Sequence, residues 1–256
     1  MPSSSNKPKV SIIIPNYNEK ANLNRGVLKE VGQYLSRVYF SWEVIINDDG
    51  STDGGDEIIS NFVKNNPGFK LIKSSHGGKA SGIWHGIQEA RGEIILFTDM
   101  DQSTPLKEIE KLLPWFDDNY QVVFGSRGKM RQNFPLLRQI TSWGFRTFRS
   151  FFLLHNIIDT QCGFKAIKTE VAKKIFPLLS VIKNSKNKTK GWSVSAFDVE
   201  LLFLGEKMGY QLKEVDVNWK DEDTSTGKGK NFINESLDML KQITQVKLND
   251  IMGKYD

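Results

Sequence analysis

Between Val10 and Asp101, short apolar runs alternate with amphipathic stretches. The runs read VSIII, VIIN, KLIKS and IILFTD, and helix-like segments separate them. Apolar strands joined by helices are typical of a parallel sheet with helices on both faces. Such sheets bind their ligands at the carboxyl ends of the strands. The pattern therefore predicts an α/β fold with a mostly parallel central sheet and a functional site along one edge.

The polar segments that follow the four runs are expected to meet at that edge. They are Asn16 to Glu19, Asp48 to Ser51, His76 to Lys79 and Asp99 to Ser103. Hydrophobic periodicity and turn signals predict the other elements. These are helices over 79–90, from Pro105, within 136–158 and over 197–208, and strands near 121–124, 163–168 and 212–219. A C-terminal helix is expected as well, with a stripe at helical spacing through Ile233, Leu237, Leu240, Ile243 and Lys247.

The composition is typical of a globular domain, and we expect the protein not to be secreted. With 39% hydrophobic residues in 256, the chain can bury a substantial core. A single cysteine, Cys162, excludes an internal disulfide framework and is expected to be buried as a small apolar side chain. The N-terminal MPSSSNKPK lacks the apolar stretch of a secretion signal, and no window reaches the roughly 18 apolar residues of a spanning helix. We expect a cytoplasmic protein with a tail over 1–8, a domain over 9–220, and a basic loop with an amphipathic helix over 221–256.

The segment FTDMDQSTP places two carboxylates just after an apolar strand. In an extended chain Asp99 and Asp101 project to the same side, where they could share a divalent cation with diphosphate oxygens. The alternative is an aspartate-rich turn that caps the helix from Pro105.

A second acidic cluster, INDDGSTDGG, follows another strand, and Asp48 or Asp49 there could accept hydrogen bonds from a base or ribose. Neighbouring carboxylate clusters repel one another unless a cation or ligand donors compensate, so the two clusters predict a polar ligand between them.

The segment SSHGGKASG is suited to a phosphate. Gly77 and Gly78 permit close approach of the backbone, and Lys79 opens a helix. A Walker A loop is excluded because Lys73 and Ala80 stand where Gly and Ser or Thr are required, and no GxGxxG fingerprint occurs. His76 and His85 have no acidic or histidine partner at metal-ligand spacing, so we interpret both as structural.

Taken together, several motifs resemble the inverting family 2 glycosyltransferases. They read VSIIIPNYNE, NDDGSTDG, GGKASGIWHGIQEARGEIILFTDMD, FGSR, DTQCGFKAI and FDVEL, and they span residues 9 to 220. Their order and spacing are similar to those of the polyprenyl (dolichyl) phosphate glucosyl and mannosyl synthases. The resemblance implies a GT-A fold, a nucleotide diphosphate sugar donor and a Mg²⁺ or Mn²⁺ cofactor.

The resemblance also assigns roles to individual residues. It implies that Pro15 and Glu19, with Tyr17 or Asn18 nearby, help to hold the nucleotide. Asp49 or Asp48 would contact the base, Lys79 a phosphate, Asp99 the donor and metal, and Asp101 would be the principal metal ligand. Two departures are Ser103, where several relatives have Gln, and Ala80, where the family usually has Gly.

The segment between Asp118 and Asp159 is basic and aromatic, with no acidic residue inside it. Such a segment can lie on an anionic membrane surface. By resemblance, residues 128–158 carry interfacial helices and receive a lipid phosphate, which Arg127, Arg131 and Arg138 would grip through bidentate guanidinium contacts. The alternative is an ordinary core-packed helix with arginines on its wet face. No recognised nucleic-acid motif accompanies the segment, so nucleic acid is not an expected partner.

A phosphate acceptor determines the mechanism that we expect. A phosphate monoester is already anionic near neutral pH, with a second pKa of about 6, so it can attack the anomeric carbon without a general base. Asp99, Asp101 and Arg127 would carry the transfer. Asp198 and Glu200 in FDVEL cannot both face the site from one helical turn, and either could act as a base for a hydroxyl acceptor or position an acceptor.

The sequence therefore predicts an inverting glycosyltransferase that moves a hexose, with glucose favoured, to a polyprenyl or dolichyl phosphate. It would act at the cytoplasmic face of a membrane, in peripheral contact with anionic lipid. A family 2 enzyme acting on a glycan or other hydroxyl is the main alternative, and a sugar nucleotidyltransferase or a non-catalytic binding module is less well supported. Uracil is favoured over guanine as the donor base, and the oligomeric state stays open.

Overall fold

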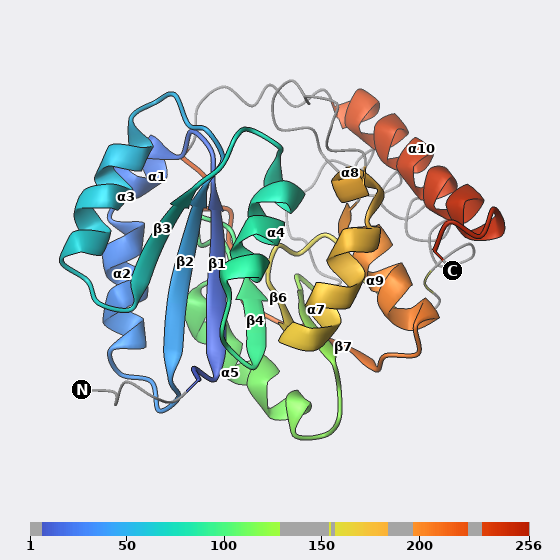
Figure 1. The fold of residues 1–256 in the computed structure, drawn as a ribbon, viewed down its shortest axis with the longest axis horizontal. Coiled ribbons are helices and arrows are strands. Elements are labelled where there is room, and N and C mark those ends of the chain that lie inside the picture. Colours follow the sequence, from blue (N-terminus) through green and yellow to red (C-terminus); the bar gives the residue numbers. More distant parts are fainter. Residues whose placement is uncertain (1–6, 129–153, 155–156, 184–196, 225–231, 256) are drawn as a thin grey trace.

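The computed structural model describes residues 7–128, 154, 157–183, 197–224 and 232–255. In this part of the chain a seven-stranded sheet lies at the centre of the molecule, in the order β3-β2-β1-β4-β6-β5-β7 (Figure 1). Every described strand except β6 runs in the same direction, because β6 pairs antiparallel with both β4 and β5. The prediction of a mostly parallel sheet is thus confirmed. The strands are β1 (Val10–Asn16), β2 (Trp42–Asp48), β3 (Phe69–Lys73), β4 (Ile94–Phe97), β5 (Val122–Ser126), β6 (Lys165–Lys168) and β7 (Leu212–Asp216).

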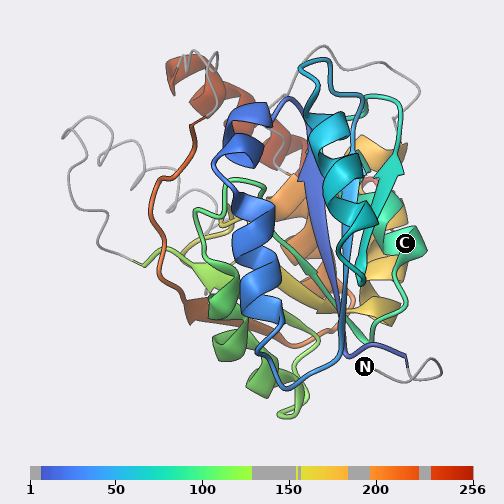
Figure 2. The ribbon, with the colours of Figure 1, turned by 90° about the vertical axis from the view of Figure 1, so that its left-hand side faces the viewer.

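Alternating side chains of the strands build a core on each face of the sheet. Ile12 and Ile14 of β1 belong to one apolar cluster and Ile13 to the other, and all three are fully buried. A fully buried aliphatic side chain contributes about 1.5–3 kcal/mol to stability, so this period-2 pattern fixes which face each residue occupies. Figure 2 shows α2 and α3 in front of the sheet, and the yellow and orange helices lie behind it.

The helices divide accordingly between the two faces. The face that contains Ile12 is covered by α1 (Lys20–Asn24), α2 (Val27–Leu35), α3 (Gly55–Lys64) and α5 (Ile109–Leu112). The opposite face is covered by α4 (Lys79–Glu89), α7 (Thr169–Ile175), α9 (Phe197–Lys207) and α10 (Phe232–Ile251). The short helices η1 (Leu106–Glu108), η2 (Leu113–Phe116), η3 (Phe176–Leu178) and α8 (Ser180–Lys183) complete the described set.

The carboxyl ends of β1, β2 and β3 are level with one another, and β4 ends beside Ile13 of β1. Asn16 of β1 pairs with Asp48 of β2, and Asp48 with Lys73 of β3. On the other side of β1, β4 ends at Phe97, which pairs with Lys165 at the start of β6. The four polar segments that follow β1, β2, β3 and β4 therefore leave the sheet at one edge, as the sequence predicted.

Some elements differ from the predictions. The strand expected over 212–219 ends at Asp216, and the helix from Pro105 is divided into η1, α5 and η2, with Pro114 inside η2. Proline lacks the N–H of a regular helical turn, which explains the break. The C-terminal helix exists and buries Ile243 in the core. The helices expected within 136–158 lie almost entirely outside the described residues.

Candidate active site

The turns after β1 and β2 are joined by a network around Ser51. Asn16 Nδ2 donates to Asp48 Oδ1 at 2.7 Å and to Ser51 Oγ at 3.1 Å. The same hydroxyl accepts the backbone N–H of Asn18 at 3.0 Å, and Asn18 adopts a left-handed conformation with φ 56°. The amide oxygen of Asn18 accepts the N–H of Thr52 at 2.8 Å. These bonds hold the two strand ends together, and Asp48 is occupied in the network instead of facing an open cleft.

Asp49 organises the loop that precedes α4. Its two carboxylate oxygens accept the N–H groups of Gly77 and Gly78, at 2.9 and 2.8 Å, and its Oδ2 lies 2.9 Å from His76 Nδ1. The carboxylate is fully buried, and burial raises the pKa of Asp49 although these donors oppose the shift. The sequence did not indicate that His76 pairs with Asp49, or that the amides of Gly77 and Gly78 bind a carboxylate of the chain itself. The contacts form because β2 and β3 are parallel neighbours, so the loops that follow them meet.

An aromatic pair lies beside this loop. The rings of Tyr17 and His76 stack with centroids 4.1 Å apart and an interplanar angle of 23°. Tyr17 follows β1 and is half-buried. The pair places a flat aromatic surface at the edge of the sheet, next to Asp49.

The turn after β4 holds Asp99 and Asp101, and we call it the DxD turn after these two aspartates. Gln102, with φ 52°, reverses the chain, and its side-chain amide donates to the Asp99 carbonyl at 2.8 Å. Lys79 forms an ion pair with Asp99, so the first residue of α4 reaches the DxD turn. Burial disfavours the charged lysine, but Asp99 and Asp198 outweigh it and raise the pKa of Lys79.

Gly163 makes room for Asp99. A Cβ atom at this position would lie only 2.0 Å from Asp99 Oδ2, a distance that atoms cannot share. The glycine precedes β6, the strand beside β4, so the close approach comes from the pairing of these two strands. Asp99 is thus held between Lys79 on one side and the bare backbone of Gly163 on another.

The two carboxylates of this turn fit a divalent cation that is shared with a substrate. Burial raises the pKa of Asp101, and the neighbouring negative charge of Asp99 adds to the shift. Such a pair of carboxylates gains stability from an added positive charge. No three His, Cys, Asp or Glu side chains of the described residues meet as a metal cluster. Mg²⁺ is commonly bound by one or two carboxylates together with substrate phosphates and water, so Asp99 and Asp101 suffice as protein ligands.

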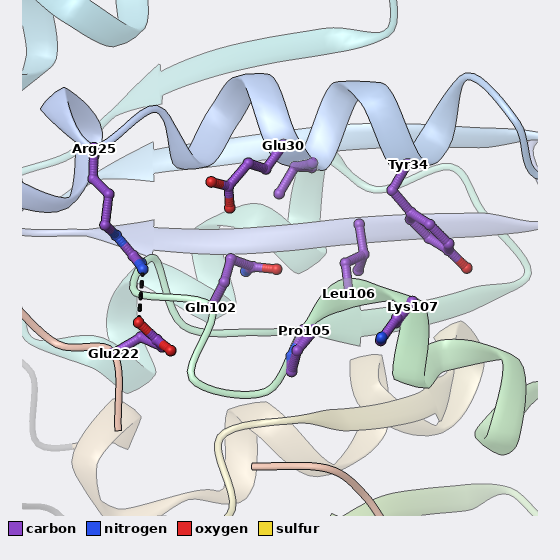
Figure 3. A pocket seen from close by; sticks show the side chains of 9 residues that line it. Arg25, Glu30, Tyr34, Gln102, Pro105, Leu106, Lys107 and Glu222 are labelled. Carbon is purple, nitrogen blue, oxygen red and sulfur yellow. Dashed lines mark hydrogen bonds and ion pairs between the residues drawn. The ribbon is translucent and has the colours of Figure 1, made fainter. Parts of the chain in front are cut away.

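A groove of about 430 Å³ lies behind the DxD turn, between α2 and residues 102–107 (Figure 3). Arg25 crosses one end of the groove, where its guanidinium donates to the Asp101 carbonyl and lies 3.3 Å from Glu222. Tyr34 lies at the other end, as Figure 3 shows. Arg25 therefore supports the turn from the side opposite to Lys79.

The segment after β7 crosses the same turn. Lys220 N donates to the Ser103 carbonyl at 2.8 Å, and Glu222 N to the Ser103 hydroxyl at 3.2 Å. Further along, the hydroxyl of Thr224 donates to Asn22 Oδ1 at 2.8 Å. Ser103 also donates its backbone N–H to Asp101 Oδ1 at 2.9 Å. Ser103 thus connects the DxD turn to residues 220–224.

A second ion pair lies at the end of β5. Arg127 binds Asp159 in a bidentate manner, with Nε and Nη2 at 2.7 and 2.8 Å from its two oxygens. Burial opposes the charge of the guanidinium, but the bonds to Asp159 raise the pKa of Arg127. Glu214 of β7 accepts the N–H of Asp159, and Trp219 lies 5.6 Å from the guanidinium carbon. Arg127 is therefore rigidly held at the edge.

A third ion pair is buried between β6 and α9. Lys165 Nζ donates to Asp198 Oδ1 at 2.6 Å and also to the Cys162 carbonyl, and Lys165 is fully buried. Cys162 is itself buried, as predicted, and burial raises the pKa of its thiol. Asp198 acts on Lys79 and Arg127 through its charge, so it lies on the side of α9 that faces the site.

The side chain of Glu200 does not contact the other described site residues but binds Ser180 and Tyr255. Its carboxylate accepts the N–H and the hydroxyl of Ser180, the latter at 2.6 Å, and the hydroxyl of Tyr255. These contacts tie α9 to α8 and to the C-terminal residues. Of the two acidic residues in FDVEL, only Asp198 is brought toward the other site residues.

The structure thus brings most of the predicted residues to one edge, with exceptions. Pro15 is buried and packs toward Gly82 of α4, and Glu19 accepts the side-chain amide of Asn22 at 2.6 Å. Arg131 and Arg138 lie outside the described residues. The sequence interpretation missed Ser51, His76, Asp159, Gly163 and Lys165. The only signal for them was their position in or beside motifs, as in DTQCGFK.

Comparisons with known proteins agree with this geometry. The model of the family "Glycosyl transferase family 2" matches residues 11–176. The dolichyl-phosphate beta-glucosyltransferase of Dictyostelium discoideum is 31% identical over 263 residues, which cover 95% of this chain and 75% of that protein. The enzyme of the same name from Saccharomyces cerevisiae is 29% identical over 269 residues, which cover 96% and 76%.

A solved structure shares the fold. Glucosyl-3-phosphoglycerate synthase from Mycobacterium tuberculosis, determined with Mn²⁺ and UDP, superposes with a TM-score of 0.65 at 16% identity, over 93% of this chain and 80% of that one. The similarity confirms the expected GT-A fold. A search of the described helices finds none that combines the length and the apolar character needed to span a bilayer.

Proposed function

Because this chain belongs to glycosyl transferase family 2, we propose that it transfers glucose from UDP-glucose to a polyprenyl or dolichyl phosphate and inverts the anomeric configuration. One observation carries the choice of reaction. Identity of about 30% to dolichyl-phosphate beta-glucosyltransferases extends over most of the chain, beyond the 11–176 segment that the family as a whole shares. The chain is a glycosyltransferase. The names of these relatives support glucose as the sugar and dolichyl phosphate as the acceptor, and the UDP bound in the solved structure supports UDP as the carrier of the sugar.

On the donor side, the nucleotide would lie along the ends of β1, β2 and β4. Tyr17 offers an aromatic face for the base, and Lys79 a positive charge for the diphosphate. Asp99 and Asp101 would hold Mg²⁺ or Mn²⁺, which when bound neutralises the charge of the leaving diphosphate. Asn18 and Glu19 shape the turn beneath the nucleotide, and Asp48 and Asp49 hold that turn in place.

On the acceptor side, Arg127 would attract the lipid phosphate. Its bidentate bond to Asp159 fixes the guanidinium in the plane from which it presents its remaining N–H groups. Arg131 and Arg138, with the aromatic residues around them, would bring the chain to an anionic membrane surface on the cytoplasmic side. Their basic charge fits lipid headgroups as well as the acceptor itself.

The transfer needs no proton acceptor from the protein. An anionic oxygen of the lipid phosphate attacks the anomeric carbon, the bond from that carbon to the diphosphate oxygen breaks, and UDP leaves with the electron pair. Asp198 is a poor candidate for a base, because accepting a proton would leave the buried Lys165 ammonium without its counter-charge. An uncompensated buried charge costs about 3–5 kcal/mol. This ion pair favours a phosphate acceptor over a hydroxyl acceptor.

The proposal is tested by measuring nucleotide release from a panel of UDP- and GDP-sugars, with Mg²⁺ or Mn²⁺, in the presence and absence of a short polyprenyl phosphate. We expect lipid-dependent release of UDP from UDP-glucose, reduced at least a hundredfold in Asp101→Ala because the leaving diphosphate loses its charge stabilisation. The matched control is Asp117→Ala, an exposed aspartate after η2. Nucleotide release that is unaffected by polyprenyl phosphate and stimulated by a glycan would favour the hydroxyl-acceptor alternative. Absence of nucleotide release from every sugar in the panel would overturn the proposal.

A further inference from the structure

The carboxylate of Glu214 binds two consecutive backbone N–H groups. Its Oε2 accepts the N–H of Ile158 and its Oε1 accepts the N–H of Asp159, both at 2.7 Å. Hydrogen bonds to a charged group contribute about 1.5–3 kcal/mol each, and two of them to one carboxylate determine the orientation of the backbone as well as its position. Glu214 of β7 thus holds the backbone of residues 158 and 159, which precede β6.

The side chain of Asp159 transmits this position to Arg127. Asp159 Oδ2 accepts the backbone N–H and the Nε of Arg127, and Oδ1 accepts Nη2 of Arg127 and the backbone N–H of Gln161, at 2.7 to 3.1 Å. A carboxylate with four such bonds has little freedom to reorient, so the plane of the guanidinium follows the backbone at residue 159. A shift of that backbone would move Arg127 together with Asp159 and leave their ion pair intact.

Glu214 lies deeper in the sheet than Arg127. In the pairing of β5 with β7, Glu214 is opposite Phe124, and Arg127 comes three residues later, directly after the end of β5. At about 3.3 Å per residue, the backbones of Glu214 and Arg127 are about 10 Å apart along the strand direction. Asp159 connects the two residues.

We propose that Glu214 is a positioning residue for the acceptor: it holds the backbone of Asp159 so that the guanidinium of Arg127 is correctly oriented toward the acceptor phosphate. The inference rests on the proposed function, because it assumes that Arg127 binds this phosphate. Misplacement of a site residue by about 1 Å costs about a hundredfold in rate. Loss of Glu214 should therefore impair use of the acceptor and leave donor binding, at the ends of β1, β2 and β4, unchanged.

A cavity of about 340 Å³ beside Glu214 makes it possible to replace the carboxylate from solution. Glu206, Tyr210 and Leu212 also line this cavity. Glu214→Ala removes a methylene and a carboxylate, which together correspond to one acetate ion. Acetate that enters from the cavity can accept the N–H groups of residues 158 and 159 in place of the lost side chain.

The test compares kcat/KM for a short polyprenyl phosphate with the affinity for UDP, measured by calorimetry in the presence of Mn²⁺. Glu214→Ala should lower kcat/KM about a hundredfold, and Glu214→Gln about tenfold, because the amide keeps one acceptor oxygen for the two N–H groups. The affinity for UDP should stay at the wild-type value in both variants. Glu206→Gln is the matched control, at an exposed carboxylate of α9 that lines the same cavity, and both quantities should be unchanged.

Acetate distinguishes positioning from a general loss of stability. In Glu214→Ala, sodium acetate should raise kcat/KM severalfold relative to sodium chloride at equal ionic strength, so that screening by salt is the same in both. Arg127→Ala lacks the group that is positioned, so acetate should not raise its kcat/KM.

Three results would overturn the inference and leave the proposed function intact. They are a wild-type kcat/KM in Glu214→Ala, a loss of UDP affinity as large as the loss of kcat/KM, and a folded Glu214→Ala that acetate does not activate. If a thermal melt shows that Glu214→Ala does not fold, Glu214→Gln decides, and a wild-type kcat/KM in that variant would overturn the inference. Absence of transfer to polyprenyl phosphate by wild type would instead overturn the proposed function, and the inference with it.

Discussion

At the scale of single residues, the position of Asp99 depends on a neighbour that has no side chain. The carboxylate occupies the space in which a Cβ of Gly163 would lie, 2.0 Å from Oδ2. Gly163 is distant from Asp99 in the sequence, and the pairing of β6 with β4 brings Gly163 to the end of β4. Asp99 also carries the ion pair with Lys79. Any side chain at position 163 must therefore displace a charged group of the active site.

Gly163→Ala should lower kcat/KM for glucose transfer about a hundredfold, because displacement of a site residue by about 1 Å costs roughly that factor. Steady-state kinetics with UDP-glucose and a polyprenyl phosphate measure the effect. Gly32→Ala is the control. Its Cβ would meet Phe69 at an ordinary 3.7 Å, and alanine stabilises a helix by about 0.5–1 kcal/mol relative to glycine, so activity should persist and Tm should rise. Full activity of Gly163→Ala would show that Asp99 does not need its observed position.

The sequence could predict a site residue only where a local pattern places that residue at the carboxyl end of the sheet. Asp99, Asp101 and Lys79 directly follow strand ends or open a helix, so local patterns place them. Lys165 and Asp159 are recognised only through their partners, Asp198 and Arg127, which lie 33 and 32 residues away. Those contacts depend on the antiparallel insertion of β6 between β4 and β5, which no local periodicity specifies.

At the scale of elements, the C-terminal residues are attached through a buried polar network. Glu200 of α9 accepts Tyr255 and Ser180, and Asn249 of α10 donates to the Ser180 hydroxyl at 3.1 Å. Burial and the nearby Glu200 raise the pKa of Tyr255 to about 12 from 10.0. The sequence predicted the helix and its apolar stripe but left open what it packs against. The network shows that α10 docks on α8 and α9.

Tyr255→Phe should lower the free energy of unfolding by about 1–3 kcal/mol at pH 8, because Glu200 loses a donor. A raised pKa means that the folded state favours the protonated phenol. The contribution of the phenol is thus complete below pH 10 and is lost as the pH rises toward about 12. Urea denaturation should show the difference between wild type and Tyr255→Phe shrinking over that range. Tyr39→Phe, at a tyrosine that is 83% exposed, should show no difference at any pH. A difference for Tyr255→Phe that stays constant above pH 10 would contradict the assignment.

The sequence predicted elements best where a long apolar run or a periodic helix dominates, as in β1 and α4. It could not predict the direction of β6, whose four residues carry no signal for parallel or antiparallel pairing. The stop of β7 at Asp216 was also missed. Val217 N still donates to Ser126 of the neighbouring strand β5, but Asn218 N donates to Glu108 and Lys220 N to Ser103. These are tertiary contacts.

At the scale of the whole molecule, three ion pairs lie along one edge of the sheet. They are Lys79 with Asp99, Arg127 with Asp159, and Lys165 with Asp198. Each carboxylate has a cation of its own, so a proton added to any of the three would leave that cation without its counter-charge. A donor diphosphate and an acceptor phosphate bring negative charge to an edge that already holds fixed cations, which stabilises charge as it moves to the leaving group. Base-free transfer to a phosphate is thus the central claim.

The most direct measurement of that claim is the kcat of the double variant Lys165→Met/Asp198→Asn with UDP-glucose and polyprenyl phosphate. Removing both charges together leaves no unpaired ion in the core, so the variant is expected to fold, and a thermal melt verifies this. Our account predicts a kcat within about tenfold of wild type. Loss of a general base costs 10²–10⁴. A folded variant that binds UDP normally and yet loses a hundredfold or more in kcat would contradict transfer without a base.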